Sequence, residues 1–272
     1  CLSFSNLFVA MAREANLDVT FQMVDIPPSF STDGELGLLN NHINILVRGI
    51  RNDANFMRDY VIDFNRAEYI GNYDTRTVTD DYAIALYFSN VAVEFIRTGN
   101  TRDAFRYLKK AIVTYSDIPD LWVNLGVLYS RNSHPEMAVK AYSQALSIQP
   151  SNKSALVNIS GTLDLLGRKE ESDYYLNQAV YYRDHNPYYH YLLSQSSYKA
   201  DRYQEVLGHL DEAIHLKRDE HKFYFLQGLT HQKLQSPELA LESFQKAKEY
   251  AQKNRVITAY ERKLQGLESQ LE

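Results

Sequence analysis

The sequence is short of several features that mark whole classes of protein. Its single cysteine, Cys1, excludes an internal disulfide framework and any zinc site that needs several cysteines. No apolar run approaches the roughly 18 residues that a membrane-spanning helix needs. Charges nearly balance, with 29 basic and 34 acidic residues and no block of like charge, which disfavours general binding to nucleic acid or to a membrane surface. Only 7 prolines and 11 glycines interrupt 272 residues, so the chain has room for many helices.

The main positive feature is an internal repeat of 34 residues. Alanine recurs at this step, at Ala111, Ala145, Ala179, Ala213 and Ala247. Small or short residues recur at Ala104, Ala138, Ser172, Val206 and Ala240, and at Ala92, Gly126, Ser160, Ser194 and Gly228. Large apolar residues recur at Leu108, Tyr142, Leu176, Leu210 and Phe244. Small side chains let two helices approach closely and the large ones fill the space between layers, so the pattern predicts stacked helical hairpins. An irregular helical bundle, the alternative, gives no reason for a constant step.

Residues 119–152 also carry a specific signature. Its positions are Trp122, Leu125, Gly126, Tyr129, Ala138, Tyr142, Ala145 and Pro150. In this spacing the chain resembles the tetratricopeptide repeat family, which implies a mainly α fold, an α-α superhelical solenoid. We expect five repeats, at 85–118, 119–152, 153–186, 187–220 and 221–254, followed by a capping helix at 255–271.

Residues 1–80 do not continue the pattern and predict a small α+β segment with a linker, which leaves residues 81–272 as the repeat region. Residues 2–16 predict a helix. Its apolar face comprises Phe4, Leu7, Phe8, Met11 and Ala15. Alternation of apolar residues predicts strands at 19–23, 42–47 and 60–64.

Three residues of this segment have the chemistry of a catalytic set. A turn centred between Asn52 and Asp53 would pair residues whose numbers sum to 105, which sets His42 opposite Asp63. A bulge, or a turn centred one residue later, would shift that pairing. Cys1 begins the helix, and a thiol at a helix amino end beside an imidazole has a lowered pKa and reacts as a thiolate nucleophile.

This arrangement resembles part of a transglutaminase-like cysteine domain. The similar segments are Cys1–Ser5, Asn41–Asn44 and Tyr60–Phe64. The resemblance implies that Cys1 is the nucleophile, His42 the base and Asp63 the acid that orients it. That family performs acyl transfer or amide hydrolysis through a thioester, and its bacterial members need no cofactor. Because such domains carry structure ahead of the nucleophile, we expect a fragment or a reduced remnant that is catalytically silent as given.

Cys1 also fits three alternative roles. A papain-like enzyme uses the same order with asparagine third, but Asn65 lies two positions from the pairing. An N-terminal-nucleophile hydrolase begins with its nucleophile, yet needs more strands than this segment has. Cys1 is also the kind of first residue that carries lipid in a mature bacterial lipoprotein. A soluble bacterial protein of the cytoplasm or periplasm and a lipid-anchored one therefore both fit, and the oligomeric state is open.

The repeats predict the main function. In a tetratricopeptide solenoid the first helices form a concave face that usually holds a peptide or a protein. The residues expected to line it are Asn90, Arg97, Asn124, Arg131, Asn158, Tyr188, Tyr191, Tyr198, Lys199, Phe225 and Lys233. Amides can hydrogen-bond an extended backbone, and tyrosines supply rigid contact area.

Some ligands are disfavoured. The lysine and asparagine clamp that holds chaperone tails is incomplete, because the positions that flank Asn124 carry Ser89, Val93 and Ser154. No phosphate loop, dinucleotide glycine set or metal motif occurs. We therefore predict a protein-interaction scaffold without cofactor or metal, whose partner is a protein or peptide and not nucleic acid. The alternative is a transglutaminase-like acyltransferase or amide hydrolase whose substrates the repeats recruit.

Overall fold

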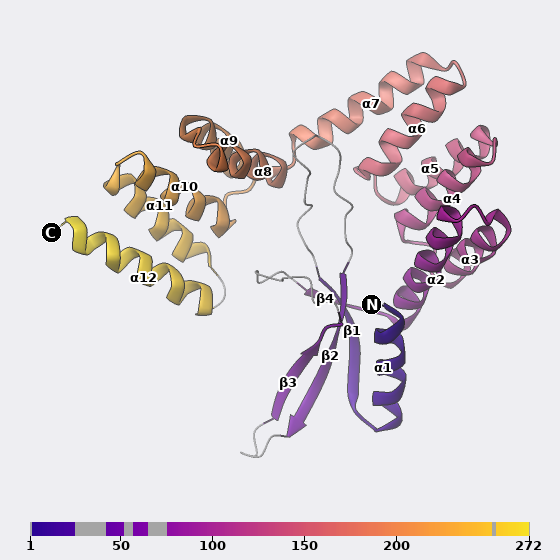
Figure 1. The fold of residues 1–272 in the computed structure, drawn as a ribbon, viewed down its shortest axis with the longest axis horizontal. Coiled ribbons are helices and arrows are strands. Elements are labelled where there is room, and N and C mark those ends of the chain that lie inside the picture. Colours follow the sequence, from indigo (N-terminus) through magenta and orange to yellow (C-terminus); the bar gives the residue numbers. More distant parts are fainter. Residues whose placement is uncertain (1, 25–41, 52–56, 65–74, 252–253, 272) are drawn as a thin grey trace. The chain divides into compact units, whose positions relative to one another are not determined.

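The structure, a computed structural model, describes residues 1–272 except 1, 25–41, 52–56, 65–74, 252–253 and 272. The described residues form twelve helices and four strands (Figure 1). They divide into two compact units, one ending at Val180 and the other running from Tyr181 onward. None of the described helices has the length and apolar content to cross a membrane. The chain is mainly α, as predicted.

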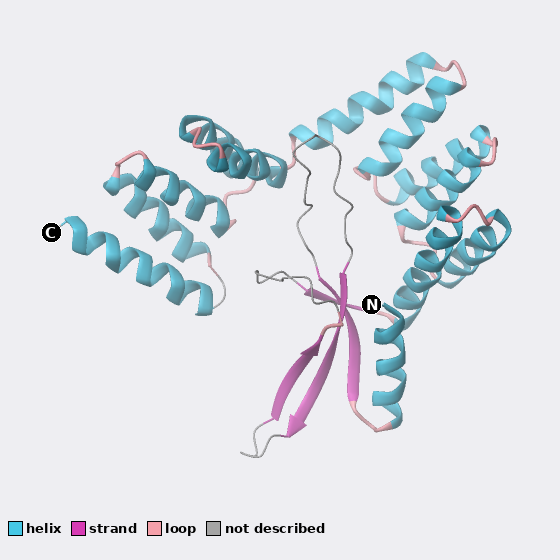
Figure 2. Cartoon of the chain, in the orientation of Figure 1, coloured by secondary structure: helices cyan, strands magenta, loops and turns pink. Residues whose placement is uncertain are grey.

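The first unit begins with a helix and a sheet (Figure 2). The elements are α1 (Leu2–Glu14), β1 (Asp18–Val24), β2 (His42–Arg51), β3 (Met57–Ile62) and β4 (Thr75–Val78). The strands are antiparallel in the order β3-β2-β1-β4. The helix and three of the strands were predicted. Strand β4 was not, because only Val78 of its four residues is buried and no alternation of apolar residues marks it.

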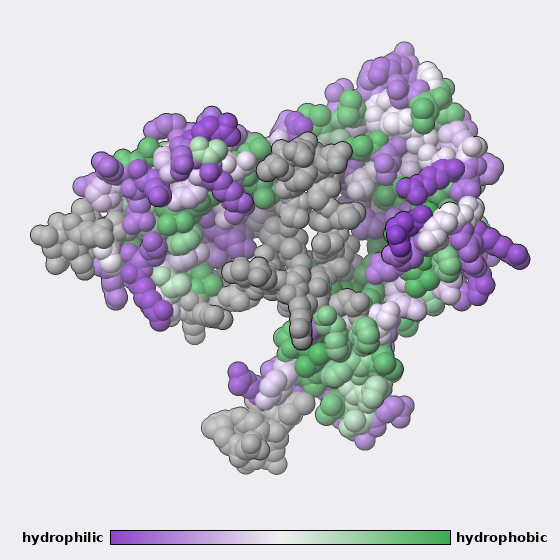
Figure 3. Space-filling view, in the orientation of Figure 1, coloured by the Kyte–Doolittle hydropathy of each residue, from purple (hydrophilic) through white to green (hydrophobic). Residues whose placement is uncertain are grey.

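Helix α1 packs on the sheet through a face that shares only Phe8 with the predicted one. Its buried residues are Ser5, Val9 and Ala12. Phe4, Leu7 and Met11, which belong to the predicted apolar face, are 64%, 57% and 64% exposed. Small and short side chains let the helix lie close to the strands, which explains the choice of face. Apolar side chains are accordingly visible over this part of the molecule (Figure 3).

The pairing of β2 with β3 differs from the predicted register. Ile45 pairs with Ile62 and Val47 with Tyr60, so paired numbers sum to 107 and not to 105. The register shifts between Val47 and Ile50. Gly49 lies in this irregularity with a φ of 65°, and its backbone N–H donates to Asp59 Oδ1 at 3.0 Å. Nearer the turn, Ile50 pairs with Arg58 and Arg51 with Met57, so paired numbers sum to 108 there. The register therefore already differs from the predicted 105 before the bulge, which changes the sum by one to 107.

That shift corrects the predicted pairing of two candidate catalytic residues. In the structure the backbone partner of His42 on β1 is Val24. Continuing the pairing of Ile45 with Ile62 by one residue sets Asp63 opposite Asn44, and not opposite His42.

The helical hairpins follow the predicted step. The first unit contains α2 (Asp80–Arg97), α3 (Thr101–Thr114), α4 (Pro119–Arg131), α5 (Pro135–Ile148), α6 (Lys153–Leu165) and most of α7 (Lys169–Asp184). The second contains α8 (Pro187–Lys199), α9 (Tyr203–Leu216), α10 (His221–Lys233), α11 (Pro237–Tyr250) and α12 (Asn254–Leu271). The first helices α4, α6, α8 and α10 begin at residues 119, 153, 187 and 221, a constant step of 34. The last helix, α12, covers the predicted capping segment.

The turns inside the five hairpins share one backbone conformation. A residue with positive φ stands at Gly99, Ser133, Gly167, Asp201 and Gln235, again 34 residues apart. In each case the N–H of the next residue donates to a carbonyl five residues earlier, for example Asn100 to Phe95 at 2.9 Å and His134 to Tyr129 at 3.0 Å. This is the bond of a helix end closed by a left-handed residue. The repeat is therefore set by turn geometry as well as by side chains.

Close helix approach holds the hairpins together. The alanines of the 34-residue row are buried throughout, as are Leu108, Tyr142, Leu210 and Phe244. A Cβ atom added to Gly126 would lie 2.3 Å from the Tyr142 ring, and one on Gly228 would lie 2.6 Å from the Phe244 ring. Leu176 is the exception in its row, since it is 48% exposed on α7, where the first unit ends.

The third repeat has a polar contact at the positions where the second has Gly126 and Ala138. Ser160 on α6 and Ser172 on α7 are both buried, and their Oγ atoms lie 3.0 Å apart. The Ser172 hydroxyl also reaches the Ser160 carbonyl oxygen at 2.9 Å. Two hydroxyls that satisfy each other replace the apolar contact of the other hairpins.

The sheet and the first repeat share a core. Val9, Phe21, Ile45 and Val78 pack in one buried cluster with Ala83 of α2. Arg13 at the end of α1 also donates from Nη2 to Asp80 Oδ1 at 2.9 Å, at the first residue of α2. The α+β segment thus sits directly on the first helix of the solenoid.

Candidate functional site

The predicted asparagine row lies on the first helices of the first unit, but its members differ in availability. Asn124 on α4 donates from Nδ2 to Ser89 Oγ on α2 at 3.1 Å, so this amide links two repeats. Asn90 on α2 is exposed and Asn158 on α6 is half-buried. The row therefore offers Asn90 and Asn158 to a ligand, while Asn124 has a structural contact.

Arg97 and Arg131 occupy the same position in successive repeats, at the last residues of α2 and α4. Arg97 Nη2 lies 2.8 Å from Glu94 Oε2, in a pair whose side chains are 74% and 67% exposed. Arg131 donates from Nη1 to the backbone oxygen of Ile96 at 3.4 Å. Among the described residues, no carboxylate forms an ion pair with Arg131.

The two arginines line one cavity of about 380 Å³. Its other lining residues are Ile96, Gly99, Thr101, Leu128 and Asn132. Thr101 donates from Oγ1 to Asn132 Oδ1 at 2.8 Å, and Asn132 donates from Nδ2 to the Leu128 carbonyl at 2.7 Å. The neutral polar groups of the rim thus bond to each other or to backbone. The lining includes no acidic side chain, but Glu94 balances the charge of Arg97 from outside it. The net positive charge of the cavity therefore comes from Arg131, and it favours an anion.

The two arginines were predicted from the sequence, but the rest of this cavity was not. Thr101 lies at the start of α3 and Asn132 just after α4, in different repeats. A 34-residue step could relate Arg97 to Arg131, whereas contact between Thr101 and Asn132 depends on how successive hairpins stack.

The predicted tyrosines of the second unit are half-buried and take part in packing. Tyr188 and Tyr191 on α8 lie against Phe223, with ring centroids 5.8 and 5.1 Å away. Tyr198 lies 5.7 Å from the Tyr203 ring, and burial raises the pKa of Tyr198. All three predicted tyrosines pack against the buried cluster between α8, α9 and α10.

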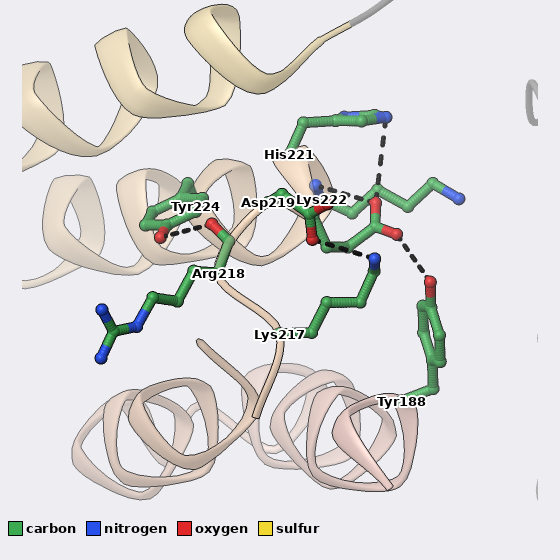
Figure 4. Close-up of polar contacts among 8 residues, drawn as sticks. Tyr188, Lys217, Arg218, Asp219, His221, Lys222 and Tyr224 are labelled. Carbon is green, nitrogen blue, oxygen red and sulfur yellow. Dashed lines mark hydrogen bonds and ion pairs between the residues drawn. The ribbon is translucent and has the colours of Figure 1, made fainter. Parts of the chain in front are cut away.

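A polar network joins the starts of α8 and α10 (Figure 4), and His221 extends it to the capping helix α12. The Tyr188 hydroxyl donates to Glu220 Oε2 at 2.9 Å, and His221 Nε2 lies 3.9 Å from Glu220 Oε1. The side chains of Glu220 and His221 are only 12% and 20% exposed. His221 Nδ1 lies 2.7 Å from the Tyr260 hydroxyl, and burial raises the pKa of Tyr260. Glu220 and Tyr260 were not predicted from the sequence, because both belong to inter-repeat contacts.

The remaining predicted groove residues of this unit have different surroundings. Phe225 stacks on Tyr260 at 4.8 Å and lies 5.5 Å from the Phe244 ring, so it contacts the capping helix and α11. Lys199 and Lys233 are exposed at the ends of α8 and α10, the positions that correspond to Arg97 and Arg131. A basic residue therefore stands at the last position of four of the five first helices.

The candidate catalytic set is only partly visible. Cys1 lies outside the described residues, and so does the side chain of His42. Asp63 follows β3, and it is not free, because it interacts with another residue. The convergence of the three residues stays a prediction. Within the part of the chain that the structure describes, no group of three His, Cys, Asp or Glu side chains is placed to hold a metal ion.

Comparison with known proteins identifies the repeats. Residues 119–152 and residues 221–254 each match a family model of the tetratricopeptide repeat. No curated protein matches the chain significantly. The chain therefore contains tetratricopeptide repeats, and its constant helical step extends the same architecture beyond the two matched segments.

Several solved structures are similar to the chain at low identity. MamA from Desulfovibrio magneticus RS-1 is 19% identical over 63% of this chain and 96% of its own, with a TM-score of 0.35. YrrB, described as a TPR protein with an unusual peptide-binding site, is 16% identical over 65% of this chain and 92% of its own, with a TM-score of 0.35. PilF from Pseudomonas aeruginosa is 18% identical over 71% of this chain and 92% of its own, with a TM-score of 0.36.

Proposed function

We propose that this protein is a protein-interaction scaffold, and that the first helices α2, α4 and α6 hold a peptide or protein partner. The observation that carries the proposal is the positively charged cavity of Arg97 and Arg131. It lies on stacked tetratricopeptide hairpins, an architecture whose surfaces commonly bind extended partners. The amides of Asn90 on α2 and Asn158 on α6 are suited to hydrogen-bond a peptide backbone.

The test is a selection of random short peptides on the immobilised 272-residue chain. We expect enriched peptides that bind in solution, as measured by fluorescence anisotropy. The variant Asn90→Ala/Asn158→Ala should weaken that binding. Gln144→Ala/Asn177→Ala removes two exposed amides from the second helices α5 and α7 and is the matched control. Absence of any enriched peptide, or equal loss in both variants, would contradict a ligand on the first helices.

We further propose that the first segment descends from a transglutaminase-like cysteine domain and is catalytically silent in this chain. Support comes from a helix that begins at Leu2 and packs on an antiparallel sheet whose strand β2 begins at His42. Cys1, His42 and Asp63 would be the inherited set. Incubation with a glutamine donor and an amine, compared with Cys1→Ala, should show no turnover in either protein. Turnover that depends on Cys1 would establish the enzyme and refute the silent state.

A further inference from the structure

Arg97 and Arg131 are held at one cavity by the repeat itself. Each ends the first helix of its hairpin, and the step of 34 residues brings equivalent positions of successive hairpins side by side. Ile96 and Leu128, the apolar residues of the lining, lie close to them in sequence. The cavity thus combines an apolar part with two cationic side chains.

Both guanidinium groups can exchange their present contacts for a ligand. The bond from Arg131 to the Ile96 carbonyl, at 3.4 Å, is at the long end of the hydrogen-bond range. The pair of Arg97 with Glu94 joins two exposed residues one helical turn apart, and such surface pairs contribute little to stability. In contrast, Thr101 and Asn132 are bonded to each other at 2.8 Å. The arginines are therefore the donors that a ligand would meet.

The chemistry of these donors selects the ligand. A guanidinium presents its N–H groups in a planar fork that matches the two oxygens of a carboxylate. The cavity volume of about 380 Å³ is near the lower end of the roughly 300–1,000 Å³ of ligand pockets, which suits one or two side chains of an extended segment. Ile96, which is half-buried, can contact the methylene groups of an acidic side chain.

We propose that Arg97 and Arg131 form an anion subsite that takes the carboxylate of an aspartate or glutamate in the partner peptide. The proposal rests on the scaffold function above and specifies the chemistry of the partner. It predicts an acidic residue at one position of the bound segment, flanked by residues whose backbone reaches the first helices.

The peptide selection also tests the subsite when it is repeated with Arg97→Gln/Arg131→Gln. We expect acidic residues to be enriched at one peptide position by the unaltered chain and not by this variant. If the unaltered chain enriches no peptides, the scaffold function itself fails. If it enriches peptides without an acidic preference, or if the variant keeps that preference, the scaffold stands and the subsite is refuted.

A selected acidic peptide then allows a direct measurement. Loss of charge-assisted hydrogen bonds in Arg97→Gln/Arg131→Gln should raise its Kd by about tenfold or more. The matched control is Lys109→Gln/Lys140→Gln, which removes the same charge from exposed positions of α3 and α5 in the same two repeats. An equal rise in Kd in the control would mean that net charge alone attracts the peptide, and would overturn the proposal. Melting curves of both variants establish that they remain folded.

Two altered peptides define the anion. Replacement of the acidic residue by its amide should weaken binding to the unaltered chain and leave binding to Arg97→Gln/Arg131→Gln unchanged. Replacement by phosphoserine should not improve binding. Tighter binding of the phosphoserine peptide, lost in the arginine variant, would reassign the subsite to phosphate.

Discussion

The second and third repeats build the same hairpin from different chemistry. In the second, Gly126 leaves room for the Tyr142 ring to lie against the helix backbone. In the third, Ser160 takes the position of Gly126 and bonds to Ser172, which takes the position of Ala138. The hairpin turn also differs, with Ser133 in one and Gly167 in the other, both at positive φ. The start of the first helix and the turn position are thus constant at the 34-residue step, whereas the groups that face each other are not.

The contrast between these hairpins accounts for which repeats are easiest to recognise. The two segments that match the family model, residues 119–152 and 221–254, contain the two glycines that face an aromatic ring. The third repeat keeps its helix positions without that pair. Its architecture is visible through the constant step and the shared turn geometry.

The largest effect should come from Gly126→Ala. The new methyl group would meet the Tyr142 ring at 2.3 Å, and overpacking of this kind costs about 1–3 kcal/mol of unfolding free energy. Urea unfolding followed by circular dichroism measures it. Gly161→Ala on α6 is the control, because no atom lies within 4 Å of its added Cβ, and it should stabilise the chain by about 0.5–1 kcal/mol. Equal destabilisation by both changes would disprove the close packing at Gly126.

The polar hairpin should respond differently to single and double changes. Ser172→Ala leaves the buried Ser160 hydroxyl without this partner, at a cost of about 1–2 kcal/mol. The double variant Ser160→Ala/Ser172→Ala should cost less than the sum of the single changes, because it recreates the alanine pair that the first repeat has at Ala92 and Ala104. A double-mutant cycle with no coupling would contradict the bond.

Exchanging the turn residues should shift stability by a smaller amount and in opposite directions. Ser133 has a left-handed backbone conformation, which costs a residue with a side chain about 1–2 kcal/mol and costs glycine much less, so Ser133→Gly stabilises the folded state. Part of this gain is lost because glycine also gives the unfolded chain more conformational freedom. Gly167→Ser imposes the same conformation where no atom would clash with the added Cβ. Thermal midpoints should rise for the first and fall for the second. Changes of the same sign would show that the turns are not equivalent.

The smallest effect concerns the first repeat, which rests on the sheet. The hydrogen bond from Arg13 lowers the pKa of Asp80, so the pair stabilises the fold above the ordinary carboxylate pKa and loses this effect as the pH falls through the lowered value. Because both side chains are more than 40% exposed, Asp80→Asn should cost at most about 1 kcal/mol at pH 7. The difference in thermal midpoint between the two proteins should shrink in acid. Asp81→Asn, also in the first turn of α2, controls for the helix dipole.

Sequence alone predicted the periodic part of this fold well and the sheet less well. Helix positions follow from the 34-residue step, because each hairpin buries the same few positions against its neighbours. The face of α1 was predicted wrongly because an apolar row marks a helix face but not which face its partner takes, and here Ser5, Val9 and Ala12 allow the closer approach. The strand register was missed because the pairs next to the turn, such as Ile50 with Arg58, already sum to 108 and not to the predicted 105. The bulge at Gly49 then changes the sum by one and leaves no periodic signal.

The candidate site shows the same division. The arginines were predicted because they recur at the repeat step. The tyrosines of α8 were predicted because they form an aromatic stretch on a first helix. The cavity itself depends on residues from two hairpins and could not be read from one sequence position. Phe225 was predicted to line the groove, yet its ring stacks on Tyr260 of the capping helix, a contact that no repeat position specifies.

Helix α2 packs both against the sheet and against the next helical hairpin. Ala83 packs with the strands, while Ala92, about two and a half turns later, packs with the second repeat. Loss of the sheet would therefore expose the buried face of α2 around Ala83 to solvent, and loss of the first hairpin would expose the apolar side chains of the sheet that pack on α2. The two regions should consequently lose hydrogen-exchange protection together, as one cooperative folding unit. In this way a small non-repetitive segment takes over the sealing role that a terminal repeat performs in other stacked arrays.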